Sequence, residues 1–288
     1  YLAGKNSGNL AADPVLQAGL ISAYDGEYGR ECAIQSALNF ILFIKASRRS
    51  KLALFGVQSN ERWHLVNGNG QIPENLAQSL GGYADQGGGP IERGMALIDI
   101  RRDGSRVKLT FANRQVRLHD FVVVTIPFSA LRAHVNLHAS LGIGAHRGLA
   151  DAIENLGYGF NAKTLISFSK RPWIAQGSQG TFYTDLDDVQ IMFETNPNVP
   201  NGAPDPVNAP AIWTRYTSGD VGFSLAGSVD TEVSKCLAAL EPAFPGANLA
   251  GAALKVNGKF VAHREHWPKN PLSEGSYTCY LVNQFTKY

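Results

Sequence analysis

The chain has 288 residues, of which 44% are hydrophobic and 17% are charged, so it can bury a large core in one large domain or two ordinary ones. Its 26 basic and 24 acidic residues give a net charge of +2, and no basic run is interleaved with aromatic residues. This pattern argues against nucleic acid as a partner. The longest apolar run, residues 37–44, is interrupted by Asn39 and is far shorter than the ~20 residues of a membrane span, so we expect none.

The cysteines and histidines give no sign of a disulfide framework or a metal site. Cys32, Cys236 and Cys279 are odd in number and lack metal-ligand spacing, which fits a reducing compartment. The seven histidines form no HExxH motif and no cluster with cysteine, so we expect no metal. The sequence opens with YLAGKNSGNL, without an initiator Met or a signal region. We therefore expect a cytoplasmic protein whose given sequence starts inside a longer chain.

The first 50 residues are predicted to be mostly helical. Residues 27–49 place Cys32, Leu38, Ile41 and Leu42 at roughly helical spacing and end in the basic run KASRRSK, which suits a helix C-terminus. From Arg62 the pattern changes to a short strand, a glycine-rich turn and a second helix. That helix has Pro73 in its first turn and Gly81-Gly82 after its end.

The glycine-rich turn GNGQIP, residues 68–73, resembles a phosphate-binding turn only in part. Pro73 stands where a dinucleotide fingerprint would have its third glycine, and no Lys-Ser/Thr pair of a P-loop follows. By itself the motif predicts a tight turn.

The next segments predict strands. Residues 95–111 alternate on both sides of Asp103-Gly104, a strong hairpin signal. A further strand follows the hairpin, and then comes an apolar stretch, Val122–Ile126, that stops at Pro127. Because continuously apolar strands are usually buried on both faces, we expect this stretch in the middle of an α/β sheet.

The second half predicts an antiparallel sheet with a helical layer. Its loops are rich in Asn, Pro and Gly, and no internal repeat is present. The expected elements are helices at about 146–156 and 229–242 and strands at 163–169, 180–184, 189–194, 211–217 and 258–265. The fold class is therefore α/β (α+β), with two domains sharing the chain discontinuously.

Five segments, in this order, resemble the flavin-containing amine oxidase family, which includes monoamine oxidases, polyamine oxidases and L-amino-acid oxidases. Each motif is weak alone, but their order and spacing agree over nearly the whole chain. The later segments are more similar to the bacterial L-amino-acid-oxidase-like branch than to the animal monoamine oxidases. The segments are HLVNGNGQIPENLA, ALIDIRRDGSRVKLTF, DFVVVTIPFSALR, IENLGYGFNAKTLISFSKRPW and REHWPKNPLSEGSY.

The resemblance implies an FAD/NAD(P)-linked reductase-type amine oxidase architecture, with an incomplete FAD-binding sheet and a substrate domain of antiparallel sheet and helices. Residues 1–58 would be the helical part of the substrate domain, and 59–140 a partial FAD-binding domain. Residues 141–262 would complete the substrate-binding domain, and 263–288 would return to the FAD-binding domain.

The resemblance also implies the cofactor, FAD, and the residues that hold it. Leu97 stands where the family presents its backbone to the adenine, and Pro127 ends a strand near the flavin. Trp267 would pack beside the isoalloxazine ring. Ser276 stands where covalent members carry a flavin-bound cysteine, and because a hydroxyl cannot form that thioether, the FAD is expected to be noncovalent. We interpret Cys279 as structural.

Lys163 matches the family lysine that holds a water against the flavin, so the resemblance implies a catalytic role for it. A solvated lysine at a strand edge is the plain alternative. Tyr277 would form one wall of the aromatic slot through which the substrate reaches the flavin. Tyr183, in the turn Tyr183-Thr184-Asp185, would line the pocket. Ordinary core packing and an ordinary Asp-containing turn are the alternatives for these two.

The sequence departs from the family pattern at both ends. It has neither the GxGxxG turn that receives the FAD pyrophosphate nor the acidic residue for the ribose, and it stops before the last flavin-binding segment. We therefore expect a central fragment that is weakly active or inactive alone. A second chain or segment, or a homodimer, would complete the FAD site.

The expected reaction is the oxidation of a primary amine or an L-amino acid to an imine, with O2 reduced to H2O2. The alternatives are a non-catalytic remnant, a substrate-domain module that binds a small ligand or a partner chain, and an unrelated α+β binding protein. An amino acid would need an Arg clamp for its carboxylate. We interpret Arg30, Arg171 and Arg215 as surface charges rather than as that clamp.

Overall fold

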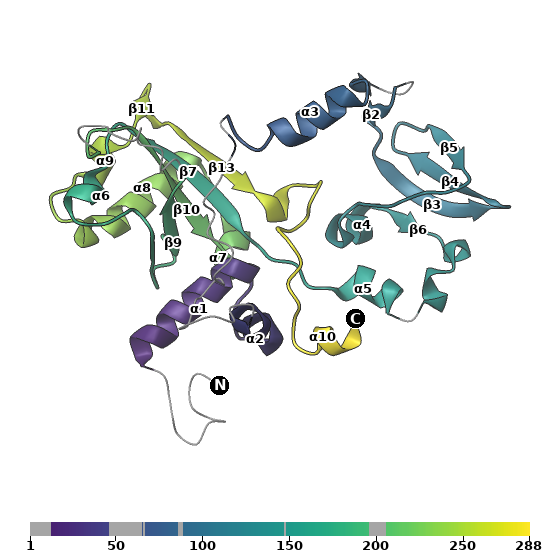
Figure 1. Cartoon of the computed structure of the whole chain (residues 1–288), viewed down its shortest axis with the longest axis horizontal. Helices are drawn as coiled ribbons and strands as arrows, with labels where there is room; N and C mark the ends of the chain where they lie inside the picture. The colour runs from purple at the N-terminus through teal and green to yellow at the C-terminus, as the bar shows by residue number, and fades with distance from the viewer. Residues whose placement is uncertain (1–12, 46–64, 66, 86–88, 147, 196–205) are drawn as a thin grey trace, which may run out of the picture. The chain divides into compact units, whose positions relative to one another are not determined.

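The computed structural model describes residues 13–45, 65, 67–85, 89–146, 148–195 and 206–288, which form two compact units (Figure 1). Unit 1 comprises residues 1–41 and 156–287, and unit 2 comprises residues 42–155 and Tyr288. Both contain helices and sheets, which confirms the predicted α/β (α+β) class. The four domain segments predicted from the sequence stay predictions.

Unit 1 is built around one five-stranded sheet. Its strands have the order β13-β7-β10-β9-β8, and all neighbours are antiparallel. The antiparallel pairing is the one that the second half of the sequence predicts. The strands are β7 (Ala162–Phe168), β8 (Phe182–Tyr183), β9 (Ile191–Glu194), β10 (Ala211–Thr217) and β13 (Ala262–His266), and a small hairpin pairs β11 (Lys255–Val256) with β12 (Lys259–Phe260). The helices of unit 1 are α1 (Pro14–Tyr28), α6 (Pro172–Ala175), α7 (Gly219–Ser224), α8 (Val229–Leu240), α9 (Leu249–Ala252) and α10 (Gln284–Lys287), with short 3-10 turns at Glu241–Ala243 and Trp267–Lys269.

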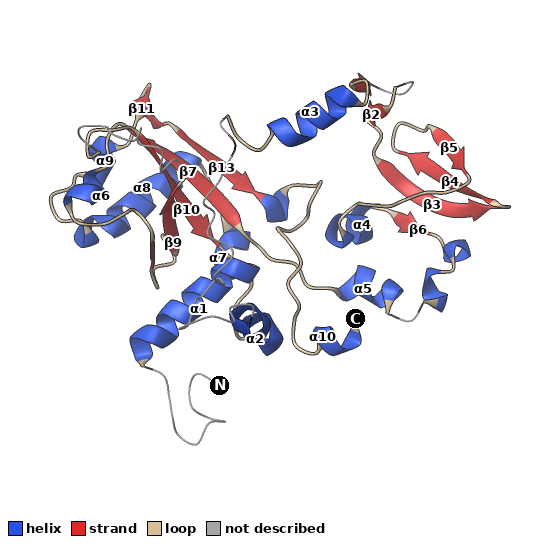
Figure 2. Ribbon diagram, viewed as in Figure 1, coloured by secondary structure: helices blue, strands red, loops and turns tan. Residues whose placement is uncertain are grey.

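One face of this sheet carries the core of unit 1. Residues alternate between the two faces of a strand, and every second residue of β7, beginning at Ala162, is buried. The helix α8 packs on this face (Figure 2). Its apolar side chains join those of the sheet in one core. At the centre Trp173 and Trp213 are fully buried and stacked, with ring centroids 4.3 Å apart. On β7 the residues of the opposite face, beginning at Lys163, are half-buried, and this face of the sheet is called the open face below.

The continuous helix expected over residues 27–49 is wrong within the described residues. The helix α1 ends at Tyr28, and α2 (Ala37–Lys45), which crosses the boundary between the units, begins only at Ala37. Gly29 ends α1 because it adopts a left-handed conformation with φ of 71° and its N–H donates to the carbonyl of Asp25.

The helix α1 lies against β8 and β9. At the contact Gly26 meets Ile191, and a Cβ added to Gly26 would lie 2.2 Å from the Ile191 Cδ1 atom. A larger residue at this position would force the end of the Ile191 side chain to move.

Unit 2 contains a four-stranded sheet in the order β5-β4-β3-β6, with strands β3 (Leu97–Asp103), β4 (Arg106–Phe111), β5 (Val116–His119) and β6 (Asn136–Leu137). Its other elements are α3 (Gln71–Ser79), β1 (Tyr83–Asp85), β2 (Ile91–Arg93), α4 (Phe128–His134), α5 (Leu149–Asn155) and 3-10 turns at Ala139–Leu141 and Ile143–Ala145. The hairpin predicted at Asp103-Gly104 is confirmed as β3 and β4. Its small core is formed by Ile100, Val107 and Leu109.

The central strand predicted at Val122–Ile126 is wrong. This segment has no strand conformation, and its flanking residue Phe121 is 91% exposed while Val123 is 87% exposed. A strand forms only where a neighbour completes its hydrogen-bond ladder, and no described strand pairs with this segment. The strand expected just after Arg62 lies largely outside the described residues.

Candidate functional site

Lys163 lies on β7, the second strand of the unit 1 sheet, and points to the open face. Its neighbours across the ladder are Tyr216 on β10 and Glu265 on β13, so the three side chains share that face. The next strand, β9, adds Phe193 to the same face, because Phe193 is paired with Thr214 and Thr214 with Leu165. Three separate segments of sequence thus meet at Lys163.

The ammonium of Lys163 lies among three aromatic rings. Its Nζ is 5.3 Å from the ring centroid of Tyr216, 5.6 Å from that of Phe193 and 5.9 Å from that of Trp267. All three distances are within the ~6 Å over which a cation is attracted to an aromatic ring. The described residues provide no carboxylate within ion-pair distance of this ammonium and no hydrogen-bond acceptor for it. Its N–H donors are therefore available to a bound molecule.

Tyr216 and Tyr277 form a hydrogen-bonded pair beside Lys163. Their hydroxyl oxygens are 2.8 Å apart, and the Tyr277 hydroxyl donates to the carbonyl oxygen of Gly26 at 3.1 Å. Burial raises the pKa of Tyr216 to about 12. Burial also raises the pKa of Tyr277, and the neighbouring Tyr216 raises it further. Both phenols are therefore neutral at physiological pH.

The loop that carries Ser276 and Tyr277 is fixed by Asn161. The Ser276 hydroxyl donates to Asn161 Oδ1, and Asn161 Nδ2 donates to the Gly26 carbonyl at 2.8 Å. The backbone of the loop pairs with Gly159 through two hydrogen bonds of 2.8 Å. A Cβ on Gly159 would lie 2.5 Å from the Ser276 Oγ atom, so this packing needs a glycine. The Ser276 hydroxyl proton is used in the hydrogen bond to Asn161, and only the oxygen lone pairs remain to accept a hydrogen bond on the open face.

Trp267 follows β13 directly and is half-buried. Its carbonyl accepts a hydrogen bond of 2.9 Å from the Ser273 hydroxyl, which holds the short turn between β13 and the Tyr277 loop. Of the predicted site residues, Lys163, Trp267, Ser276 and Tyr277 therefore lie in one region of unit 1.

Tyr183 lies on β8, at the far edge of the same sheet. It is paired with Ile191, which is paired with Tyr216, which faces Lys163. Tyr183 therefore shares the open face but stands three strand spacings, about 14 Å, from Lys163. Its part in binding a substrate stays a prediction.

Leu97 and Pro127 belong to unit 2. Leu97 is the first residue of β3, and Pro127 immediately precedes α4. Their contacts with FAD stay predictions, since each unit is described by itself.

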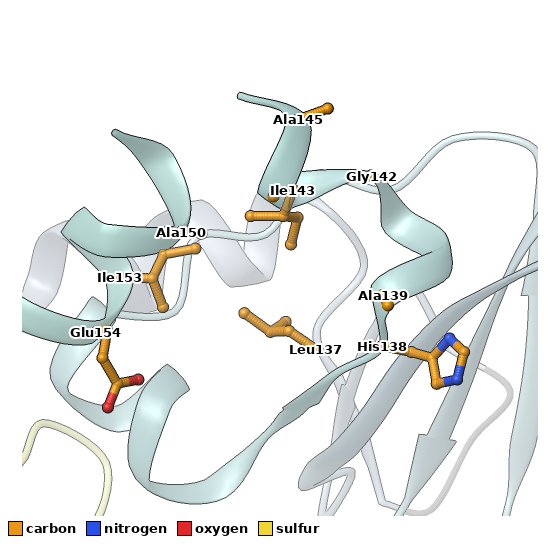
Figure 3. Close-up of a pocket in the computed structure, with 10 residues that line it drawn as sticks. Leu137, His138, Ala139, Gly142, Ile143, Ala145, Ala150, Ile153 and Glu154 are labelled. Atoms are coloured by element: carbon orange, nitrogen blue, oxygen red, sulfur yellow. The ribbon is translucent and has the colours of Figure 1, made fainter. Parts of the chain in front are cut away.

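Unit 2 also has a shallow pocket of about 400 Å³ (Figure 3). The side chains of Leu137, Ile143 and Ile153 face it, with Glu154 at its margin. None of the predicted site residues lines this pocket, so it does not enter the candidate site. Its lining residues are Leu137, His138, Ala139, Gly142, Ile143, Gly144, Ala145, Ala150, Ile153 and Glu154.

The interpretation of Arg171 and Arg215 as surface charges is wrong. Arg171 is 1% exposed, and its Nε atom is 2.7 Å from the carboxylate of Glu194. Arg215 is 3% exposed, pairs with Thr164 on the buried face of the sheet, and has its pKa lowered by burial. Both guanidinium groups thus lie on the core side. Arg30 is half-buried, with its guanidinium over the ring of Phe160 at 4.3 Å.

The sequence matches the family model of flavin containing amine oxidoreductases over residues 4–286, so the chain belongs to this family. A search of curated proteins found no match. Among solved structures, a putrescine oxidase double mutant from a structure-based redesign of cofactor binding has a TM-score of 0.68 at 14% identity. Cyclohexylamine oxidase from Brevibacterium oxydans IH-35A has a TM-score of 0.66 at 14% identity. In both cases the match covers 95% of this chain and 55% of the other chain.

Wild-type putrescine oxidase bound to putrescine is also similar, with a TM-score of 0.54 at 14% identity over 75% of this chain and 42% of the other. The likenesses confirm the predicted amine oxidase architecture. The chain spans about half the length of these relatives. No described helix is long and apolar enough to cross a membrane, and no group of metal-ligating side chains occurs among the described residues.

Proposed function

We propose that this chain supplies the substrate side of an FAD-dependent oxidase, which converts a primary amine or an L-amino acid to an imine and reduces O2 to H2O2. The observation that carries the proposal is the Lys163 ammonium, held on the open face among the rings of Phe193, Tyr216 and Trp267. Membership of the flavin containing amine oxidoreductase family supports the same reading.

The described residues fit the ring end of a flavin. Lys163 offers N–H donors that no described oxygen accepts, and Trp267 offers a half-buried flat ring beside them. The hydroxyl of Ser276 donates to Asn161 and cannot form a thioether, which supports noncovalent binding of FAD. Leu97 and Pro127 would contribute from unit 2. Completing the site would take a further segment, a second chain or a homodimer.

When bound, FAD supplies the redox chemistry, accepting a hydride from the carbon that bears the neutral amine and passing the electrons to O2. Lys163 would hold a water by donating a hydrogen bond from Nζ. Tyr277 and Tyr216 would exclude bulk water and orient the amine without protonating it, because their hydroxyl protons are used in hydrogen bonds and their pKa values are raised. The released imine would then be hydrolysed by water.

Among the described residues, the three arginines weighed as a carboxylate clamp support an amine more than an amino acid. Clamping an α-carboxylate takes a free guanidinium, and those of Arg171 and Arg215 are turned into the core. Arg30 is stacked on Phe160. Putrescine and cyclohexylamine, which give the similar enzymes their names, are therefore the first amines to test.

The proposal predicts that the chain binds FAD reversibly. In equilibrium dialysis the side holding the protein is expected to accumulate flavin, and denaturation is expected to release all of it, because no thioether forms. Dialysis detects weak binding as well as tight binding. Lys170→Met, which alters an exposed lysine after β7, should accumulate as much flavin as the unmodified chain and so serves as a control. Equal flavin on both sides would contradict the proposal and favour a non-catalytic module. Flavin that stays with the denatured chain would contradict noncovalent binding.

A further inference from the structure

We propose that Tyr216 is a positioning residue, which fixes the ring of Tyr277 as a wall of the amine path and ties that wall to Lys163. The inference rests on the proposed function in one respect, since it takes Tyr277 to line that path. Neither the family resemblance nor the sequence pattern indicates Tyr216.

The position of Tyr216 follows from strand pairing. Tyr216 is directly opposite Lys163 in the β7/β10 ladder, which brings its ring to 5.3 Å from the Nζ atom of Lys163. The hydroxyl at the far end of the same ring is 2.8 Å from that of Tyr277. One side chain therefore contacts both the cation and the wall.

The direction of the hydrogen bonds can be assigned. The Gly26 carbonyl can only accept, so the Tyr277 hydroxyl uses its one proton on Gly26. The Tyr216 hydroxyl must then donate to Tyr277. Asn161 donates to the same carbonyl and holds the acceptor in place.

Tyr277 needs this support because it lies on a loop and not on a strand. Its side chain is 39% exposed, and the hydrogen bonds of its hydroxyl join it to α1 and to β10. A hydrogen bond between two side chains restricts the orientation of both. Without the Tyr216 hydroxyl, the Tyr277 hydroxyl would keep only its bond to Gly26, while the Tyr216 ring would still lie beside Lys163.

The test is Tyr216→Phe in the whole chain, read by NMR of tyrosines labelled with 13C at the Cζ carbon. The Tyr277 signal is expected to move at neutral pH, because its hydroxyl loses an accepted hydrogen bond. Burial, which raises the pKa of Tyr277 more than any other cause, is left unchanged. Tyr277 therefore stays neutral, and its signal reports the loss of the hydrogen bond and not a change of charge.

Two further variants complete the test. Tyr83→Phe removes an exposed tyrosine of unit 2 and should leave the Tyr277 signal in place. Tyr277→Phe assigns that signal and should itself move the Tyr216 signal, which gives a second reading if Tyr216→Phe does not fold. A Tyr277 signal with unchanged position in folded Tyr216→Phe would overturn the proposal. These readings need neither flavin nor amine, so their failure and that of the proposed function are separable.

Discussion

Replacing Lys163 with Met is expected to slow amine oxidation by the FAD-loaded chain about 100-fold, the lower end of what a positioned proton-handling group contributes. Methionine keeps the length of the side chain but removes the charge and all three N–H donors. The rings of Phe193, Tyr216 and Trp267 would still enclose it, so binding of the amine should change less than the rate at saturating amine. Stopped-flow absorbance of the flavin measures both quantities.

The matched control is Lys170→Met, the same substitution at an exposed position just beyond the end of β7. It should leave the rate within about a factor of two of that of the unmodified chain, because the effects of surface substitutions are usually this small. A Lys163→Met protein that oxidises amines at the unmodified rate would show that Lys163 is only a solvated lysine.

Replacing Trp213 with Ala is expected to lower the free energy of unfolding of unit 1 by about 3–5 kcal/mol. Trp213 is fully buried and stacked on Trp173, and its ring also contacts Phe168, Phe182 and Phe244. Alanine would leave a cavity among these rings. It would also leave the carbonyl of Gly180 without the indole N–H that donates to it at 2.7 Å.

Urea unfolding followed by circular dichroism measures this loss without depending on tryptophan fluorescence. Trp213→Phe should lose less, because it keeps part of the aromatic packing. Val256→Ala, at a 63% exposed position in the β11/β12 hairpin, should change the stability by less than about 0.5 kcal/mol. A loss below 1 kcal/mol for Trp213→Ala would mean that the core is not packed around this ring.

Local chemistry made several elements predictable. The hairpin of β3 and β4 follows from Asp103-Gly104, because a glycine accepts the positive φ of 61° that the turn imposes on Gly104. The strand predicted at residues 163–169 is likewise confirmed as β7 (Ala162–Phe168). In both cases the determining residues are close together in the sequence.

Long-range pairing was not predictable from the sequence. Tyr216 and Phe193 lie within strands that the pattern predicts, but only the register between strands brings their rings to Lys163. No local signal indicates that register. The same reason applies to Arg171 before α6, whose guanidinium is paired with Glu194 on the distant strand β9.

Hydrophobicity alone was misleading at Val122–Ile126. An apolar run predicts a buried strand, yet strand formation also needs a neighbour to accept and donate the backbone hydrogen bonds. No described strand does so here, and Phe121 and Val123 are exposed.

We propose that the open face around Lys163 belongs to an enzyme that passes electrons from an amine to a flavin. This role can be tested by equilibrating the chain with FAD, removing oxygen, and adding a primary amine while the visible spectrum is recorded. We expect the oxidised flavin band to bleach with the amine, to return when O2 is admitted, and to bleach much more slowly in Lys163→Met. Flavin that is bound but keeps its oxidised band in excess amine would contradict this role.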